Sequence, residues 1–261
     1  KVLSGTGKWN NCWLVVAGAA LVALLIDLIL IKNKPADIGQ IPDGSSDVTE
    51  SMAKPGKKAS KYIPYSTKDD WTVKEALTNS RCWLTLAAAI GLYIPYMMLI
   101  SHGIACLGDH GIPASAAAFS ISLVTATSIV GRLLGGELCN RMPARFVWAG
   151  SLVVLLMGSI FLMTATGTVG MVLYAVCTGI GFGASFVCMP VVFSSYYGAK
   201  IYSSLFGTLF PIITICSSIS PTLAGYLFDA SGSYTSGFIM IIAFNVVGII
   251  ASLLNTPPKK Q

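Results

Sequence analysis

Charged residues are scarce in this chain of 261 residues: Asp, Glu, Lys and Arg make up 11% of it, against 54% hydrophobic residues. Soluble domains carry about 25% charged residues, so the composition excludes a soluble multi-domain protein. The net charge of +6 does not indicate a nucleic-acid-binding protein. The basic residues lie in the connections between apolar runs and form no basic face interleaved with aromatic side chains.

The sequence also lacks the patterns of catalytic and metal sites. It has no nucleophile–base arrangement, no phosphate-binding loop and no metal motif, and its seven cysteines form neither a Cys-x-x-Cys pair nor a Cys/His cluster. Scattered cysteines inside apolar runs are typical of small buried side chains. We therefore expect no enzyme, no cofactor and no metal ion.

What the chain does have is seven long apolar segments. A helix needs about 20 apolar residues to cross a bilayer. The seven segments are 11–31, 82–101, 115–138, 147–165, 169–195, 203–227 and 237–254. The first is too long for a signal-peptide core and has no cleavage pattern. They predict an all-α membrane protein with seven transmembrane helices in the plasma or inner membrane.

The basic residues predict the orientation of these helices. Of the 17 Lys and Arg residues, fourteen lie in one set of connections, two precede the first span, and one, Arg132, lies inside a span. The rich set comprises 32–81, 139–146, 196–202 and the C-terminal tail. Cytoplasmic loops carry the excess of Lys and Arg, so we expect the N-terminus outside and the C-terminus in the cytoplasm.

The connection 32–80 is the only long one. It is rich in Lys, Ser, Asp, Gly and Pro, a composition typical of a mostly disordered linker. Near its end, Trp71, Val73, Ala76 and Leu77 have helical spacing and predict a short helix at the membrane interface.

Four stretches resemble motifs of one transporter family. They are 35–44 (PADIGQIPDG), 102–111 (HGIACLGDHG), 131–145 (GRLLGGELCNRMPAR) and 225–234 (GYLFDASGSY). In this order they resemble the major facilitator superfamily, in the group of the oxalate/formate antiporters and the monocarboxylate transporters. The resemblance implies that 1–31 is the sixth helix of that fold, 32–80 its central linker, 81–255 its C-terminal six-helix bundle and 256–261 a cytoplasmic tail. The chain would then be a fragment, and the N-terminal half of the same transporter its partner.

Arg132 is the first candidate site residue. A charge at membrane depth is costly and usually faces a partner or a water-filled cavity. The resemblance implies that Arg132 binds a substrate carboxylate, which its planar guanidinium can hold through two hydrogen bonds. The alternative is an arginine whose side chain reaches the cytoplasmic interface. Ser128, one turn earlier on the same face, stands where the monocarboxylate transporters have a proton-coupling aspartate, and it cannot carry a proton.

Three further residues are candidates for the substrate site. Tyr93 and Tyr96 flank Pro95 midway along their span and either line the cavity or pack in the core. His102, at the predicted outer end of that span, titrates near physiological pH. It either lines the outer vestibule or sits at the headgroup level.

The connection after Arg132 resembles a degenerate copy of the superfamily's cytoplasmic gating loop. Its candidate gating residues are Gly136, Asn140, Arg141 and Arg145. Asn140 replaces the motif's acidic residue, which weakens any charge relay. Glu137 and Arg141 are spaced for a pair within one helix. Two glycine pairs, Gly131 with Gly135 and Gly179 with Gly183, are typical of close helix packing.

These observations favour a secondary transporter for a small organic anion, with a proton or a counter-anion as a coupled solute. The oxalate antiporter carries a second intramembrane base in its eleventh helix, whereas the matching span 203–227 contains none. One cation suits a monocarboxylate. The alternatives are a facilitator for an unrelated solute, such as a sugar or a drug, and a complete seven-span receptor.

Overall fold

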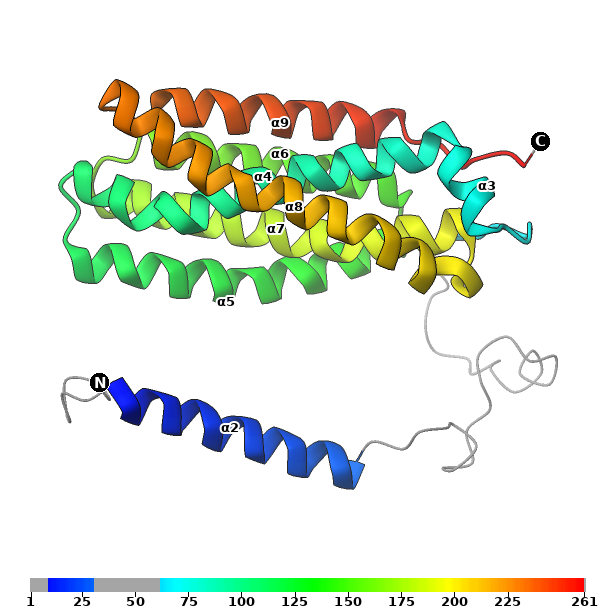
Figure 1. Ribbon diagram of the computed structural model, residues 1–261, viewed down its shortest axis with the longest axis horizontal. Coiled ribbons are helices and arrows are strands. Elements are labelled where there is room, and N and C mark those ends of the chain that lie inside the picture. The colour runs from blue at the N-terminus through cyan, green and yellow to red at the C-terminus, as the bar shows by residue number, and fades with distance from the viewer. Residues whose placement is uncertain (1–8, 31–61, 261) are drawn as a thin grey trace. The chain divides into compact units, whose positions relative to one another are not determined.

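The computed structural model of the chain describes residues 9–30 and 62–260, and all regular secondary structure in these ranges is helical (Figure 1). The chain divides into two compact parts, 1–59 and 60–261, which we describe separately. In the first part, α2 spans Trp9–Leu30. The second part holds α3 (Val73–Thr78), α4 (Ser80–Asp109), α5 (Ala114–Cys139), α6 (Ala144–Met163), α7 (Gly167–Tyr197), α8 (Ala199–Ser231) and α9 (Thr235–Leu254).

Six of these helices, α4 to α9, are long and apolar enough to cross a membrane. They correspond to the last six predicted spans and confirm an all-helical, multi-pass membrane protein. The helix α2 is 22 residues long and matches residues 11–30 of the first predicted span. Its membrane crossing, and with it the count of seven, stays a prediction.

The six long helices form one bundle with a distinct inside and outside. The helix α7 packs along α5 on one side and α6 on the other, while α4 packs against α8 and α9. The most apolar 18-residue stretches of α4 and α7 are each 61% buried, whereas those of α5 and α8 are only 28% buried. The bundle therefore has a core around α4 and α7, and α5 and α8 present large apolar surfaces outward.

Small residues allow the helices to approach closely. A Cβ atom added at Gly91 of α4 would lie 2.6 Å from the Cα of Gly248 in α9, and one added at Gly135 of α5 would lie 2.8 Å from the Cα of Ala184 in α7. Such backbone contact is the usual use of small residues between membrane helices. The glycine pairs singled out in the sequence are thus confirmed as packing residues.

Proline occurs inside three helices without ending them, as the span assignment requires. Pro95 lies in α4, Pro190 in α7, and Pro211 and Pro221 in α8. Pro95 has no N–H, so the carbonyl of Gly91 loses its partner within α4. The side-chain amide of Asn245 in α9, which is fully buried, donates to that carbonyl at 3.2 Å. A neighbouring helix therefore satisfies the group that the proline frees.

We expect Asn245→Leu to destabilise the bundle by about 1–3 kcal/mol, because it leaves the Gly91 carbonyl buried without a donor while keeping the same branched arrangement of side-chain heavy atoms. Thr214→Val is the control, since the exposed Thr214 hydroxyl only donates to its own helix. Thermal unfolding of both variants in one detergent measures the difference. Equal unfolding temperatures would mean that the Asn245 amide does not support the break at Pro95.

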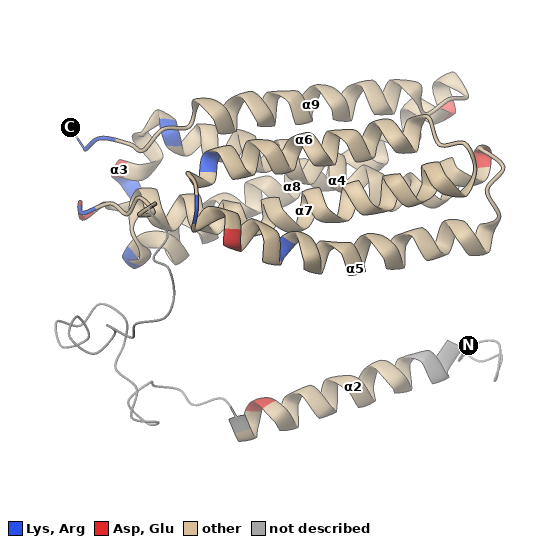
Figure 2. Cartoon of the chain, turned by 180° about the vertical axis from the view of Figure 1, so that it is seen from behind, with Lys and Arg blue, Asp and Glu red and all other residues tan. Residues whose placement is uncertain are grey.

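One end of the bundle collects most of its Lys and Arg residues, beside α3 and the C-terminus (Figure 2). We call it the basic end and define it by Arg81, Arg141, Arg145, Lys200 and Lys260. The opposite end carries Asp109 and Asp229, where α4 and α8 finish.

The last part of the predicted linker packs on the basic end. The N–H of Thr67 donates to the carbonyl of Ser195 at 2.8 Å. The buried ring of Trp71 meets Tyr197 edge-on, with 5.3 Å between centroids. Lys260 lies 3.3 Å from the Glu75 carboxylate. The expectation of a mostly disordered linker therefore does not hold for 62–72, because aromatic side chains bury against the end of α7; residues 31–61 lie outside the described part.

The short helix predicted near Trp71 is confirmed as α3. Thr72 caps it: the Thr72 side chain accepts from the N–H of Glu75, and the N–H of Thr72 donates to the Glu75 carboxylate at 2.7 Å. This reciprocal arrangement is a capping box. The hydrogen bond from the Thr72 backbone lowers the pKa of Glu75 below its usual value.

One predicted boundary is wrong. The span predicted to end at residue 101 continues as α4 to Asp109. The turn comes at Gly111, whose φ of +76° suits glycine. His102 is therefore well inside the helix rather than at its end.

Candidate functional site

Arg132 projects from the exposed side of α5 toward α7. Its guanidinium carbon lies 4.8 Å from the ring centroid of Phe186, a cation–π contact. Within the described ranges, Arg132 forms no ion pair with a carboxylate. Its charge is thus positioned by an aromatic ring and stays available to an anion.

An aromatic cluster from three helices continues from Phe186. Phe186 lies 5.8 Å from Phe182, and Tyr96 of α4 stacks on Phe182 with 3.6 Å between ring centroids and 8° between planes. Tyr93 contacts Phe182 edge-on at 6.2 Å and Phe210 of α8 at 5.9 Å. The structure therefore brings Tyr93 and Tyr96 into the aromatic cluster that Arg132 contacts through Phe186.

The hydroxyl of Tyr93 is buried inside this cluster. The Tyr93 side chain is 5% exposed, and its hydroxyl has no hydrogen-bond partner among the described residues. A buried hydroxyl without a partner costs about 1–3 kcal/mol.

Ser128 is not part of this cluster. It is buried where α5 meets α7, and a Cβ added at Gly183 would run into its backbone carbonyl. Its hydroxyl donates to the carbonyl of Thr125 in the same helix at 2.7 Å. Although Ser128 and Arg132 are one turn apart, they have different surroundings. Ser128 is packed between α5 and α7, whereas Arg132 is exposed at the edge of that helix contact.

His102 is also separate from the arginine. Its Nε2 lies 2.9 Å from the carbonyl oxygen of Pro221, which can only accept, so Nε2 donates. Its Nδ1 lies 3.4 Å from the hydroxyl of Tyr234. His102 follows Tyr96 by six residues, about 9 Å along the helix. It therefore joins α4 to α8 and to the start of α9, toward the end opposite the basic end.

The candidate gating residues lie at the basic end in different surroundings. Arg141, two residues past the end of α5, pairs with Glu137 at 2.6 Å between Nη2 and Oε1, which confirms the predicted pair. The N–H of Asn140 donates to the Glu137 carbonyl at 3.2 Å. Gly136 has open space around it, with Val187 Cγ1 at 3.9 Å from an added Cβ.

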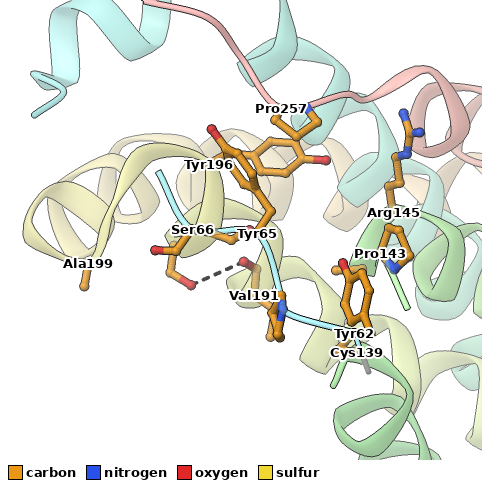
Figure 3. A pocket seen from close by; sticks show the side chains of 14 residues that line it. Tyr62, Tyr65, Ser66, Cys139, Pro143, Arg145, Val191, Tyr196, Ala199 and Pro257 are labelled. Carbon is orange, nitrogen blue, oxygen red and sulfur yellow. Dashed lines mark hydrogen bonds between the residues drawn. The ribbon is translucent and has the colours of Figure 1, made fainter. Parts of the chain in front are cut away.

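Arg145 lines a pocket at the basic end of about 470 Å³ (Figure 3). Its guanidinium also lies over the ring of Phe146 at 4.5 Å, and its carbonyl accepts from Ser252 Oγ at 2.8 Å. Tyr62 and Tyr65, from the last part of the linker, also line this pocket, together with Tyr196. This pocket lies at the end of α5, where its lining residue Cys139 follows Arg132 by seven residues.

The sequence did not identify the residues that support Arg132. Phe182 and Phe186 are one turn apart beside the glycines of α7, and this spacing places both on one face. That pattern alone does not distinguish a binding wall from core packing. Within the described ranges, no group of three His, Cys, Asp or Glu residues is placed to hold a metal ion.

Comparison with known proteins places the chain among membrane transporters. The family model of the Major Facilitator Superfamily matches residues 2–221. Monocarboxylate transporter 13 of Bos taurus is 26% identical over 246 residues, which cover 92% of this chain and 51% of the relative. Monocarboxylate transporter 13 of Rattus norvegicus is 31% identical over 60% of this chain and 36% of its own length. Monocarboxylate transporter 7 of Homo sapiens is 26% identical over 87% of this chain and 43% of its own length.

The chain spans about half the length of these curated relatives, since 51% of the Bos taurus protein is covered. The relatives are transporters by name, in agreement with the expectation that the chain is not an enzyme. The family match covers most of the chain, including the segment that contains Arg132. The chain belongs to the Major Facilitator Superfamily.

Proposed function

We propose that this chain forms the C-terminal half, with the preceding helix, of a secondary transporter for a small monocarboxylate-type anion. The observation that carries the proposal is the Arg132 guanidinium, held over Phe186 without a carboxylate partner in the described part of the chain. Phe186 in turn contacts Phe182, against which Tyr93 and Tyr96 pack. The similarity to monocarboxylate transporters supports the class of solute.

A single carboxylate fits the charges of this cluster. Arg132 can hold it through two parallel hydrogen bonds, which a planar guanidinium makes better than an ammonium. The helix α8 begins with Lys200 next to its N-terminus and has no other basic residue. A dicarboxylate would leave its second charge beside the rings of Phe182 and Phe210, without a cation. The site therefore favours one carboxylate and an apolar or small remainder.

The exposed apolar surfaces of α5 and α8 favour a second half of the transporter beside this bundle. Only 28% of the most apolar stretch of each of these helices is buried. Arg132 lies on α5. A partner half facing α5 and α8 would enclose the site at mid-membrane depth, and the two halves would rock about it. Because Ser128 carries no titratable group and no carboxylate pairs with Arg132 in the described part, a counter-anion fits the coupled solute better than a proton relayed beside Arg132.

Uptake by the full-length protein tests the solute. Cells that express it are given labelled lactate, formate and oxalate, with an untransfected control. We expect accumulation of the monocarboxylates and exclusion of oxalate at equal concentration. Uptake of a neutral sugar with no competition from lactate would contradict the proposal and favour an unrelated solute.

We further propose that the basic end faces the cytoplasm, because Lys and Arg concentrate there. Single cysteines introduced at Lys200 and at Ser231, at opposite ends of α8, test this. A membrane-impermeant maleimide should label Lys200→Cys only in inside-out vesicles and Ser231→Cys only in intact cells. Labelling of both from the same side would rule out this orientation.

A further inference from the structure

Two cysteines 49 residues apart meet where α5 and α7 end their contact. An added Cβ at Gly131 would run into Ile180, and one at Gly135 would lie 2.8 Å from Ala184. One turn further along each helix, Cys139 of α5 faces Cys188 of α7, and their sulfur atoms are 3.7 Å apart. All three pairs keep the same separation of 49 residues, so the thiol contact follows from the register of two parallel helices.

Both thiols are buried, but one of them borders open space. Cys139 is 5% exposed and Cys188 is fully buried. Cys139 also lines the pocket of about 470 Å³ at the basic end, with Pro143, Arg145 and Tyr62 around it (Figure 3). A water molecule occupies about 30 Å³ of liquid volume, so a small peroxide can enter this pocket. Cys188 is not among the residues that line this pocket.

We propose that Cys139 and Cys188 form a peroxide-sensitive thiol pair that closes to a disulfide between α5 and α7. The Cys139 sulfur attacks one oxygen of hydrogen peroxide, which breaks the O–O bond, forms a sulfenic acid and releases water once a proton is transferred. The Cys188 sulfur then attacks the Cys139 sulfur, the S–S bond forms, and the hydroxyl leaves as a second water molecule. Two thiols lose two electrons in total, and the peroxide is reduced to two waters.

The geometry requires only a small movement. A disulfide has its sulfur atoms about 2.05 Å apart, so the two atoms must approach by about 1.6 Å. Cys139 is the last residue of α5, where the chain turns toward α6, and it faces Cys188 of α7. On the proposed orientation the pair faces the reducing cytosol, where a disulfide is transient and responds to oxidant.

The disulfide would restrain the helices that carry the candidate site. Cys139 follows Arg132 by seven residues, about 10 Å along α5. In α7, Cys188 follows Phe186 by two residues. A covalent link here would hold Arg132 and Phe186 in one relative position. This consequence for transport rests on the proposed function, whereas formation of the disulfide does not.

The test uses the full-length protein in native membrane vesicles. Vesicles are treated with hydrogen peroxide, the protein is denatured in sodium dodecyl sulfate with N-ethylmaleimide to block all remaining thiols, and the digest is analysed by mass spectrometry without reductant. We expect a cross-linked peptide joining Cys139 to Cys188, loss of maleimide from both residues, and restoration of both thiols by dithiothreitol. Cys139→Ser and Cys188→Ser should each abolish the link, whereas Cys177→Ser, which changes a thiol outside the pair, should keep it.

The unmodified protein keeps the test decisive even if a serine variant fails to fold. Maleimide on both Cys139 and Cys188 after peroxide would overturn the proposal. A sulfinic acid on Cys139 with a free Cys188 would also overturn it, because the second thiol would then not capture the first oxidation product. If the link forms and uptake is unchanged, the thiol pair stands and its effect on transport is wrong.

Discussion

Replacing Arg132 with alanine should weaken monocarboxylate binding by roughly 10- to 100-fold, with lysine between alanine and arginine. Hydrogen bonds to charged groups contribute about 1.5–3 kcal/mol, and each 1.4 kcal/mol is about tenfold in affinity. Alanine removes the cation that offsets the buried carboxylate. Lysine keeps the charge but loses the planar two-point fit.

The contact with Phe186 sharpens the comparison of arginine with lysine. An arginine that only extends to the membrane interface would be replaced almost freely by lysine, since both side chains reach water in the same way. An arginine that lies 4.8 Å from the centroid of an aromatic ring and holds a carboxylate through two hydrogen bonds would lose function when replaced by lysine. The lysine variant therefore separates the two roles of Arg132.

The measurement is the concentration of lactate that gives half-maximal uptake, compared at matched abundance in the membrane. Lys74→Ala is the control, because Lys74 is an exposed cation on α3, away from the candidate site. It removes one positive charge and should leave the half-maximal concentration unchanged. An unchanged value for Arg132→Lys would show that Arg132 makes no bidentate contact with the substrate.

Local patterns in the sequence predicted much of the fold. Hydropathy located the six long helices, because each must be apolar over about 20 residues to be stable in a bilayer. Spacing within one helix predicted the Glu137–Arg141 pair and the α3 segment near Trp71, since both depend only on neighbours three or four residues away. The glycines at Gly135 and Gly183 indicated close packing for the same reason.

Features that depend on the register between helices were not predictable in this way. The sequence placed Ser128 and Arg132 on one face of α5, but the position of α7 decides that Ser128 is buried against Gly183 while Arg132 reaches Phe186. His102 was assigned to a helix end because apolar residues give way to small and polar ones there. Its hydrogen bond to the Pro221 carbonyl involves a residue more than one hundred positions away in the sequence.

The same register can be tested directly with two adjacent glycines of α5. In Gly135→Ala the new methyl group would lie 2.8 Å from the Cα of Ala184, whereas in Gly136→Ala it would lie 3.9 Å from the end of Val187. Overpacking costs about 1–3 kcal/mol, and alanine in place of glycine favours a helix by about 1 kcal/mol. We therefore expect Gly135→Ala to lower the unfolding temperature and Gly136→Ala to raise it or leave it unchanged.

Thermal unfolding of the full-length variants in one detergent measures this pair, and each variant serves as the control for the other. The two substitutions add the same methyl group to the same helix at neighbouring positions, so differences in expression or detergent binding should cancel. Gly135 lies between Arg132 and Cys139, and it is the point where α5 comes nearest the backbone of Ala184. If both variants unfold at the same temperature, α5 does not meet α7 in this register. The contact of Arg132 with Phe186 and the approach of Cys139 to Cys188 would then fail together, because both follow from it.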